Sequence, residues 1–216
     1  MTPDAVAEIR AEIAALPRRY TPELRALRKR WSKRLEAESA AHVIAIAQAF
    51  ERAAPQEGKW LAYELIRHHT AAFEAVDEAV LEGFAGRIES WYATDAFGTI
   101  LSGPAWAAGR LSGAEVDRWS RSEDKWRRRT ALTTSVGRNA ARPDPDATFD
   151  LCLRLAADPD DMIEKAVSWA LRYLSQKDKA AVATFMAEHG DKFRPRVRRE
   201  VRNKLATGLK TPKGRR

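Results

Sequence analysis

The stretch IEKAVSWALRYL (residues 163–174) decides the fold class of this chain. Projected at about 100° per residue, its apolar residues fall within one arc, the stripe that an α-helix turns towards a core. These residues are Ile163, Ala166, Val167, Ala170, Leu171 and Leu174. Trp169 projects to the opposite face, between Lys165 and Arg172. The stretch therefore predicts a helix that buries one face and displays a tryptophan between two cations on the other.

Most of the remaining chain carries the same kind of pattern. In TPELRALRKRWSKRL, Thr21 is typical of an N-cap and Pro22 of the first helical position. The expected helices span 4–16, 22–37, 40–53, 57–69, 74–86, 89–101, 113–120, 124–139, 147–156, 161–175, 177–188 and 195–206. Short breaks such as PQEG, SGP and RPDPD separate them. Because no alternating β-branched run occurs, no sheet is expected.

Many short helices joined by tight loops, without heptads, indicate stacked helical hairpins rather than a bundle or coiled coil. HEAT repeats have this form and pair helices in units of about 40 residues. We therefore predict an all-α fold of stacked antiparallel helix pairs that form a curved HEAT-like α-solenoid with a concave basic groove. Residues 1–206 are expected to form one domain, and residues 207–216 a disordered basic tail.

Composition narrows the possible classes of protein. The chain has 216 residues, of which 44% are hydrophobic, so a packed core is expected rather than disorder. It contains no apolar run long enough for a membrane span, and its N-terminus does not resemble a signal peptide. The single cysteine, Cys152, excludes an internal disulfide and disfavours a metal site. We expect a cytoplasmic protein with no metal, no cofactor and no membrane partner, in which Cys152 is a core residue.

The charge distribution favours an anionic partner. The net charge is +8, and the basic residues cluster late in the chain, in KWRRR (residues 125–129), RPRVRREVRNK (194–204) and the tail. Nucleic acid is the leading candidate partner for such a pattern. The alternative is a basic protein that binds no polyanion.

Three groups of polar and aromatic residues stand out. Trp91 and Asp95 are four residues apart, and therefore lie on one side of a helix. Arg129 falls inside an apolar stripe, so it needs either a protein carboxylate or a bound phosphate. Trp169 with its two cations suits a nucleic-acid backbone, because cations hold phosphates and a ring packs on sugar or base. The structural alternatives are a capping carboxylate, a salt bridge, and a tryptophan packed against a neighbouring helix.

In their order along the chain, these segments resemble the HEAT-like-repeat alkylpurine DNA glycosylases, the AlkD type of DNA alkylation repair protein. The resemblance rests on TPELRALRKR, SWYATD, DKWRRRTAL, IEKAVSWALRYL and RPRVRREVRNKL. It covers about three quarters of the chain and is clearest from residue 87 to residue 204, whereas the N-terminal region is shorter than is usual in the family.

The resemblance implies roles for particular residues. Trp91 and Trp169 would flank the deoxyribose of the lesion, and Asp95 would be the catalytic carboxylate. Arg129 would contact the DNA backbone near the lesion. The family's phosphate-contact positions correspond to or neighbour Arg172, Arg25, Thr21 and Lys165, and Lys125 in the basic cluster is added to this set. Some relatives lack the catalytic residues, but the four central positions are retained here.

The activity implied is hydrolysis of the N-glycosidic bond of N3- or N7-alkylated purines in duplex DNA by a monomer, without base flipping. An alkylated purine is cationic and departs as a neutral base, so no general acid is required. One carboxylate then suffices to stabilise the oxocarbenium-like sugar and orient water. A non-catalytic protein that binds distorted or branched DNA is the first alternative, and a protein–protein scaffold is another.

Overall fold

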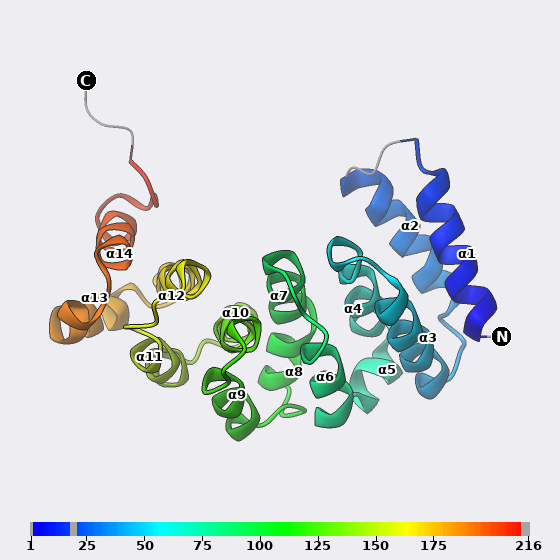
Figure 1. Ribbon diagram of the computed structural model, residues 1–216, viewed down its shortest axis with the longest axis horizontal. Helices are drawn as coiled ribbons and strands as arrows, with labels where there is room; N and C mark the ends of the chain where they lie inside the picture. The colour runs from blue at the N-terminus through cyan, green and yellow to red at the C-terminus, as the bar shows by residue number, and fades with distance from the viewer. Residues whose placement is uncertain (1, 18–20, 213–216) are drawn as a thin grey trace.

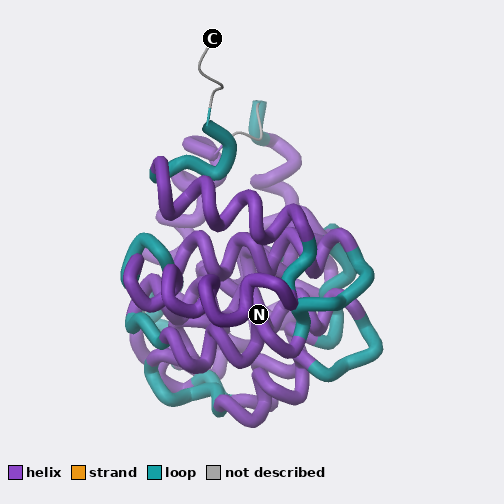
Figure 2. Tube along the Cα trace, turned by 90° about the vertical axis from the view of Figure 1, so that its left-hand side faces the viewer, coloured by secondary structure: helices purple, strands orange, loops and turns teal. Residues whose placement is uncertain are grey.

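The computed structural model of the chain describes residues 2–17 and 21–212, and within these ranges every regular element is a helix (Figure 2). The α-helices are α1 (Thr2–Ala15), α2 (Thr21–Arg34), α3 (Ala40–Ala53), α4 (Trp60–Arg67), α5 (Thr70–Ala75), α6 (Glu78–Ala85), α7 (Trp91–Phe97), α8 (Gly103–Ala107), α9 (Gly113–Ser120), α10 (Lys125–Ala141), α11 (Pro145–Arg154), α12 (Asp161–Leu174), α13 (Lys179–His189) and α14 (Pro195–Thr207). Two 3-10 turns, η1 (Gln56–Gly58) and η3 (Gly190–Lys192), and a π-helical turn, η2 (Gly98–Ser102), complete the set. The all-helical prediction is therefore confirmed for this part of the chain.

Figure 1 shows the helices following one another along an arc, with α2, α4, α7, α10, α12 and α14 on its inner side. The helices α1, α3, α6, α9, α11 and α13 lie on the outer side. Consecutive helices are held together by packing, and α10 at the middle packs against both α7 and α12. Helices α1 and α14 lie at opposite ends of the arc.

Polar N-caps fix where most of these helices begin. In each case a side chain accepts a hydrogen bond from a backbone N–H in the first turn, which satisfies a donor that the helix itself cannot. The capping residues are Ser39, His69, Asp77, Ser90, Ser112, Asp124, Asp144, Asp160 and Asp178. Two of these caps correct the sequence prediction. His69 and Asp77 start new helices, so the expected helices 57–69 and 74–86 are replaced by η1, α4, α5 and α6.

The predicted break at SGP is wrong. The helix that starts at Trp91 runs on through the π-helical turn η2 into α8 and ends at Ala107. Pro104, which has no backbone N–H to donate, lies just after this π-helical turn. The π-helical turn between Gly98 and Ser102 shifts the hydrogen-bond register between α7 and α8 without breaking the helix. The result is one long bent rod that packs along α10.

Glycines let this rod touch α10 backbone to backbone. A Cβ on Gly137 would lie 2.1 Å from the carbonyl oxygen of Gly98, and one on Gly103 would lie 2.5 Å from Gly137. A Cβ on Gly98 would meet Thr133 at 2.3 Å. None of these separations is compatible with a side chain at that position. The small residues therefore set how closely α7 and α10 approach each other.

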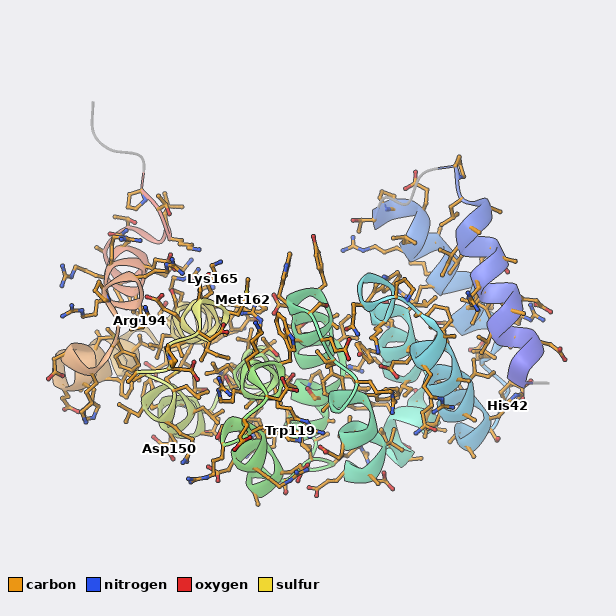
Figure 3. All side chains as sticks on the ribbon, in the orientation of Figure 1. His42, Trp119, Asp150, Met162, Lys165 and Arg194 are labelled. Atoms are coloured by element: carbon orange, nitrogen blue, oxygen red, sulfur yellow. The ribbon has the colours of Figure 1, made fainter. Side chains whose placement is uncertain are left out.

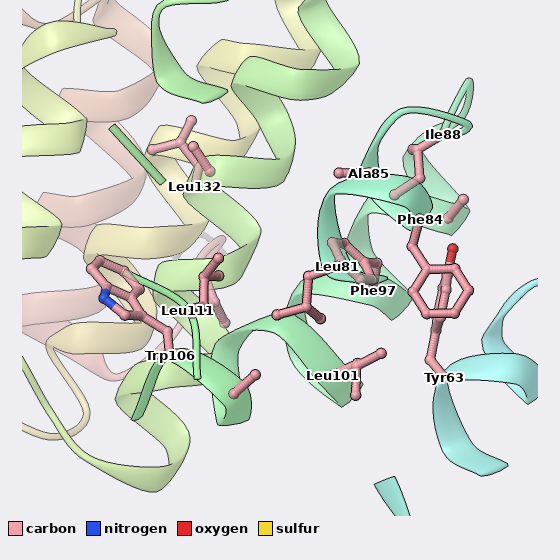
Figure 4. Close-up of a cluster of buried hydrophobic side chains, with 14 of the residues drawn as sticks. Tyr63, Leu81, Phe84, Ala85, Ile88, Phe97, Leu101, Trp106, Leu111 and Leu132 are labelled. Carbon is pink, nitrogen blue, oxygen red and sulfur yellow. The ribbon is translucent and has the colours of Figure 1, made fainter. Parts of the chain in front are cut away.

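The core below this contact is apolar and rich in aromatic rings. Figure 4 shows part of it, where Tyr63 of α4 meets Phe84 of α6 and Phe97 of α7. The ring centroids of Tyr63 lie 5.5 Å from Phe84 and 5.1 Å from Phe97, in edge-on or tilted arrangements that aromatic pairs favour. This cluster anchors α7 from beneath.

A buried ion-pair network holds the loop that leads into α7. The Glu51 carboxylate on α3 is fully buried and accepts hydrogen bonds from Lys59 Nζ (2.5 Å) and Arg87 Nε (2.6 Å). Lys59 Nζ also donates to the carbonyl of Arg87, at 3.0 Å. Because buried charges require such partners, the network fixes the position of Arg87, and with it the start of α7.

The C-terminal helix and the residues after it form a capped end. Gly208 follows α14 in the left-handed conformation, with φ of 76°. The segment then turns back, so that the side-chain amide of Asn203 donates to the carbonyl of Lys210. Of the tail predicted from residue 207, residues 213–216 lie outside the described residues. Along the described chain, no helix is long and apolar enough to cross a lipid bilayer.

Candidate functional site

The centre of the candidate site is a carboxylate on α7 held by an arginine on α10. Arg129 Nη2 donates to Asp95 Oδ1 at 2.8 Å, and Nε donates to the same oxygen at 3.2 Å and to Thr94 Oγ1 at 3.0 Å. The third nitrogen, Nη1, donates to the carbonyl of Met162 at the start of α12. One guanidinium thus joins three consecutive inner helices at the side of Asp95.

Arg129 is buried, with only 5% of its surface exposed, although it lies on a helix of mixed polarity. The sequence left open whether its counter-anion would be a carboxylate or a phosphate, and the structure supplies Asp95. All three guanidinium nitrogens donate to protein acceptors, so Arg129 positions Asp95. The contact of Arg129 with the DNA backbone that the family resemblance implies stays a prediction.

Residue spacing explains why these groups meet. Arg129, Thr133 and Gly137 are four residues apart, and so form one row along α10. The hydroxyl of Thr133 donates to the carbonyl of Thr94 at 2.9 Å, and the next step of the row reaches Gly98. The close contact between Gly98 and Gly137 therefore holds Asp95, one turn before Gly98, next to the guanidinium of Arg129.

The two oxygens of Asp95 have different surroundings. Oδ1 accepts the hydrogen bonds from Arg129, whereas Oδ2 accepts none from any residue that the structure describes. The side chain is 26% exposed, so Oδ2 is accessible from outside the protein. Burial raises the pKa of the Asp95 carboxyl above its ordinary value, and the nearby Arg129 charge and hydrogen bonds only partly oppose that rise. The arrangement presents one anchored, partly desolvated carboxylate with a free oxygen.

Trp91 begins the same helix one turn before Asp95. Its side chain is 40% exposed, and its ring stacks on that of Tyr92, with centroids 3.6 Å apart and an angle of 25° between the planes. Ser90 caps this turn by accepting from the N–H of Ala93. The prediction that Trp91 and Asp95 share one side of a helix fits this geometry, and the ring is open to solvent rather than part of the core.

Trp169 lies on α12, on the far side of α10 from α7 (Figure 1). It is half-buried and packs against the hydrophobic core, so it is less outward-facing than the helical projection indicates. Neighbouring helices cover part of the face that appears polar in projection. Trp169 is therefore packed against its neighbours and still partly accessible.

The predicted phosphate contacts differ in how available they are. Lys165 lies on the inner side of the arc (Figure 3) and pairs with Asp161 one turn earlier, at 2.6 Å. Lys125 at the start of α10 lies 3.5 Å from Asp160 and remains 44% exposed. Both ammonium groups have carboxylate neighbours at the surface, where such pairs exchange readily for another anion.

Arg172 differs from these lysines. Its Nε donates to Ser168 Oγ at 3.1 Å and lies 3.7 Å from the carboxylate of Glu200 on α14. Only 16% of its side chain is exposed, and burial lowers the pKa of its guanidinium. Arg172 therefore contributes to the contact between α12 and α14, and its guanidinium is less available to an external phosphate than the sequence indicates.

Thr21 and Arg25 lie at the beginning of α2, near one end of the arc and away from the Asp95 centre (Figure 1). Both side chains are exposed. Arg25 has no ion-pair partner among the described residues, which leaves its charge available. The predicted residues thus form a central group on α7, α10 and α12 and a separate basic group on α2.

Two residues at the centre escaped sequence reasoning. Thr94 supports Arg129 through its hydroxyl, and Tyr92 covers one face of Trp91. A threonine beside a helical carboxylate and a tyrosine beside a tryptophan are both common in cores. The local sequence pattern therefore did not mark either residue as part of a functional site. Chemically, the site can stabilise a nearby positive charge and orient a water molecule through Asp95 Oδ2, with an aromatic face beside it.

A model of the protein family described as DNA alkylation repair enzyme matches residues 19–205. No match was found among curated proteins or among solved structures.

Proposed function

Because the chain belongs to the DNA alkylation repair enzyme family, we propose that it is an AlkD-type DNA glycosylase. Its reaction would be hydrolysis of the N-glycosidic bond of N3- or N7-alkylated purines in duplex DNA, as a monofunctional hydrolase. The observation that carries this proposal is the Asp95 carboxylate, which is partly desolvated, anchored through one oxygen and open at the other.

The chemistry requires little more than this carboxylate. Alkylation at N3 or N7 makes the purine cationic, so the base leaves with the bonding electron pair as a neutral molecule. Positive charge develops on the deoxyribose, and Asp95 Oδ2 would stabilise it and orient the water that attacks C1′. The attacking water passes its proton to solvent, and the remaining hydroxyl on C1′ completes the abasic product. In a site with restricted water, this attraction is stronger than it would be in bulk solvent.

Arg129 has a supporting role in this proposal. Its charge favours the ionised form of Asp95. Its Nε and Nη2 donate to Oδ1 and keep that oxygen directed inward, while Nη1 donates to the Met162 carbonyl. Trp91 and Trp169 would contact the lesion deoxyribose from α7 and α12, where their π-faces favour positive charge. The lesion would not enter a pocket, and its lability as a cationic nucleotide would provide selectivity.

The proposed DNA path follows the inner side of the arc. Exposed Trp91 on α7, Lys165 on α12 and Arg25 on α2 all belong to helices of that side (Figures 1 and 3). The helix order, with an inner and an outer helix repeated along the curve, supports a curved HEAT-like α-solenoid that forms one domain to residue 206. We propose that the protein acts as a monomer, in the cytoplasm, on double-stranded DNA with alkylated bases.

The alternative is a non-catalytic protein of the same fold that binds distorted or branched DNA. It would share the basic surface and the salt-dependent affinity. The presence of Asp95 with a free oxygen favours the enzyme, since a purely binding surface gains nothing from an anion facing the DNA.

Release of methylated bases separates the two functions. Duplex DNA methylated at purines is incubated with the protein, and free 7-methylguanine and 3-methyladenine are measured by chromatography. The glycosylase proposal requires release above the spontaneous rate. Binding of methylated or abasic duplex without any release would support the non-catalytic alternative.

Replacement of Trp169 by alanine should reduce excision about tenfold, because one cation–π contact to the transition state is lost. The ring is half-buried, so some loss of stability is also expected. Trp60→Ala is the matched control, since Trp60 is also half-buried against the core but lies on α4. Melting temperature and single-turnover rate are measured for both. An equal fall in rate for the two variants would assign Trp169 to core packing alone.

The pH dependence of excision should reflect the raised pKa of Asp95. The ionised carboxylate is the active form, so the rate should fall as pH decreases through a pKa higher than that of an ordinary aspartate. Single-turnover rates between about pH 4 and 8, corrected for spontaneous base loss, measure this limb. The raised pKa of Asp95 has the opposite effect on the pH dependence of folding stability. A raised pKa means that Asp95 favours folding at low pH, and that this contribution is lost as pH rises through the pKa. An acid limb at the ordinary aspartate pKa would contradict the assignment.

A further inference from the structure

The first turn of α7 presents a second aromatic ring that has no assigned role. Tyr92 is 50% exposed and Trp91 is 40% exposed, and both are among the few large apolar side chains that remain exposed in the described chain. Burying such rings would stabilise the protein by roughly 25 cal/mol per Å² of apolar surface, so leaving two of them adjacent and open is unfavourable in water. The pair lies within one turn of Asp95.

The two rings do not diverge as neighbouring helical side chains normally do. Positions i and i+1 are about 100° apart around a helix, so their side chains point in different directions. Here the centroids are 3.6 Å apart and the planes are inclined by 25°. Each ring therefore covers one face of the other, and each retains one face that the partner does not cover.

The spacing of this stack matches that of nucleobases. Successive bases of one DNA strand are about 3.4 Å apart along the helix axis. A Trp–Tyr pair at 3.6 Å is therefore a two-layer stack that a base can extend on the free face of Tyr92. Stacking of bases on aromatic side chains is tolerant of sequence because every base has a π-face.

We propose that Tyr92 contacts DNA directly: while Trp91 lies against the sugar of the lesion, the free face of Tyr92 stacks on a nucleobase at the damaged step. This inference rests on the proposed function, because it takes the Asp95 centre as the place where the lesion sugar lies. The stack would replace base–base contact that is lost where the duplex opens. Tyr92 would thereby strengthen binding to damaged duplex more than to intact duplex.

The aromatic ring carries the contact, since the phenol oxygen of Tyr92 has no hydrogen bond to a described residue. Tyr92→Phe should therefore behave as the unaltered protein does. Tyr92→Ala should weaken binding to duplex with a stable abasic-site analogue about tenfold, as expected from the loss of one base–aromatic stack. Affinity for intact duplex should change much less. Leu209→Ala, which removes another exposed apolar side chain, is the control and should have no effect.

Photo-crosslinking tests the contact without any need for catalysis. A duplex carries the abasic-site analogue with 5-iodouracil at the adjacent position, and crosslinked peptides are identified by mass spectrometry after irradiation. Attachment at Tyr92, lost in Tyr92→Ala and retained in Tyr92→Phe, is the expected result. Attachment elsewhere together with unchanged affinity of Tyr92→Ala would overturn the inference.

The two possible failures are distinguishable. Excision by the unaltered protein, with no Tyr92 crosslink and unchanged affinity of Tyr92→Ala, would overturn the Tyr92 contact and leave the glycosylase assignment intact. A Tyr92 crosslink without excision would overturn the glycosylase assignment and leave the Tyr92 contact with DNA intact. Slower excision by Tyr92→Ala at unchanged affinity would show that Tyr92 only braces Trp91, and would also overturn the inference.

Discussion

Replacement of Asp95 by asparagine is expected to reduce excision of 7-methylguanine and 3-methyladenine by about 100- to 1,000-fold. This is the range found when a single electrostatic contact to a transition state is removed. The amide is nearly the same shape as the carboxylate, but it carries no charge to stabilise the developing positive charge on the sugar. Single-turnover rates on methylated duplex, with base release followed by chromatography, measure the effect.

The substitution leaves most of the surrounding contacts in place. Arg129 keeps Thr94 Oγ1 and the Met162 carbonyl as acceptors, and the amide oxygen can replace Asp95 Oδ1. Affinity for a duplex with an abasic-site analogue should therefore persist. Asp150→Asn is the matched control, because Asp150 is exposed on α11, on the outer side of the arc (Figure 3). Excision at the unaltered rate by Asp95→Asn would refute the catalytic assignment.

Replacement of Gly137 by alanine is expected to destabilise the protein by about 3 kcal/mol, the upper part of the range for overpacking a core. The new Cβ would lie 2.1 Å from the Gly98 carbonyl oxygen, so the rod from α7 to α8 would have to move away from α10. For a chain of this length, the corresponding fall in melting temperature is about 6–12 °C. Thermal unfolding followed by circular dichroism measures it.

The same displacement should reach the candidate site. Arg129 and Gly137 lie in one row of α10, while Asp95 and Gly98 lie in adjacent turns of the opposing rod. Excision at a temperature where the variant is folded should therefore also decrease. Gly113→Ala is the control, because a Cβ there meets only the Trp106 ring at 3.9 Å. Equal melting temperatures for the two variants would show that the close contact is not the constraint that holds α7 against α10.

Much of the local structure could be predicted from the sequence. The helices with one clear apolar stripe, such as α12, and those with a Pro or polar cap at their start, such as α2 and α14, begin and end close to the predicted residues. Arg129 in an apolar stripe indicated a buried cation that requires an anion. These are properties of short segments, where one periodicity and one cap decide the outcome.

The predicted break at SGP was wrong, and two side-chain arrangements at the site do not follow from the local pattern, because distant segments change the local preference. The sequence SGP resembles a loop. Gly103, however, has no side chain and can therefore contact the backbone of Gly137, and the helix continues through it. Trp169 projects to a polar face, yet neighbouring helices cover part of it. The stack of Tyr92 on Trp91 depends on side-chain orientations that helical spacing does not specify.

The sequence by itself therefore determines the helical class, the bounds of helices such as α12 and α14, and the need of Arg129 for a counter-ion, since each depends on residues a few positions apart. The identity of that counter-ion, the closeness of α7 to α10 and the open second oxygen of Asp95 arise only when residues more than thirty positions apart are packed together. Burial and backbone contact are properties of that packing, and they decide which carboxylate is anchored and which rings stay open.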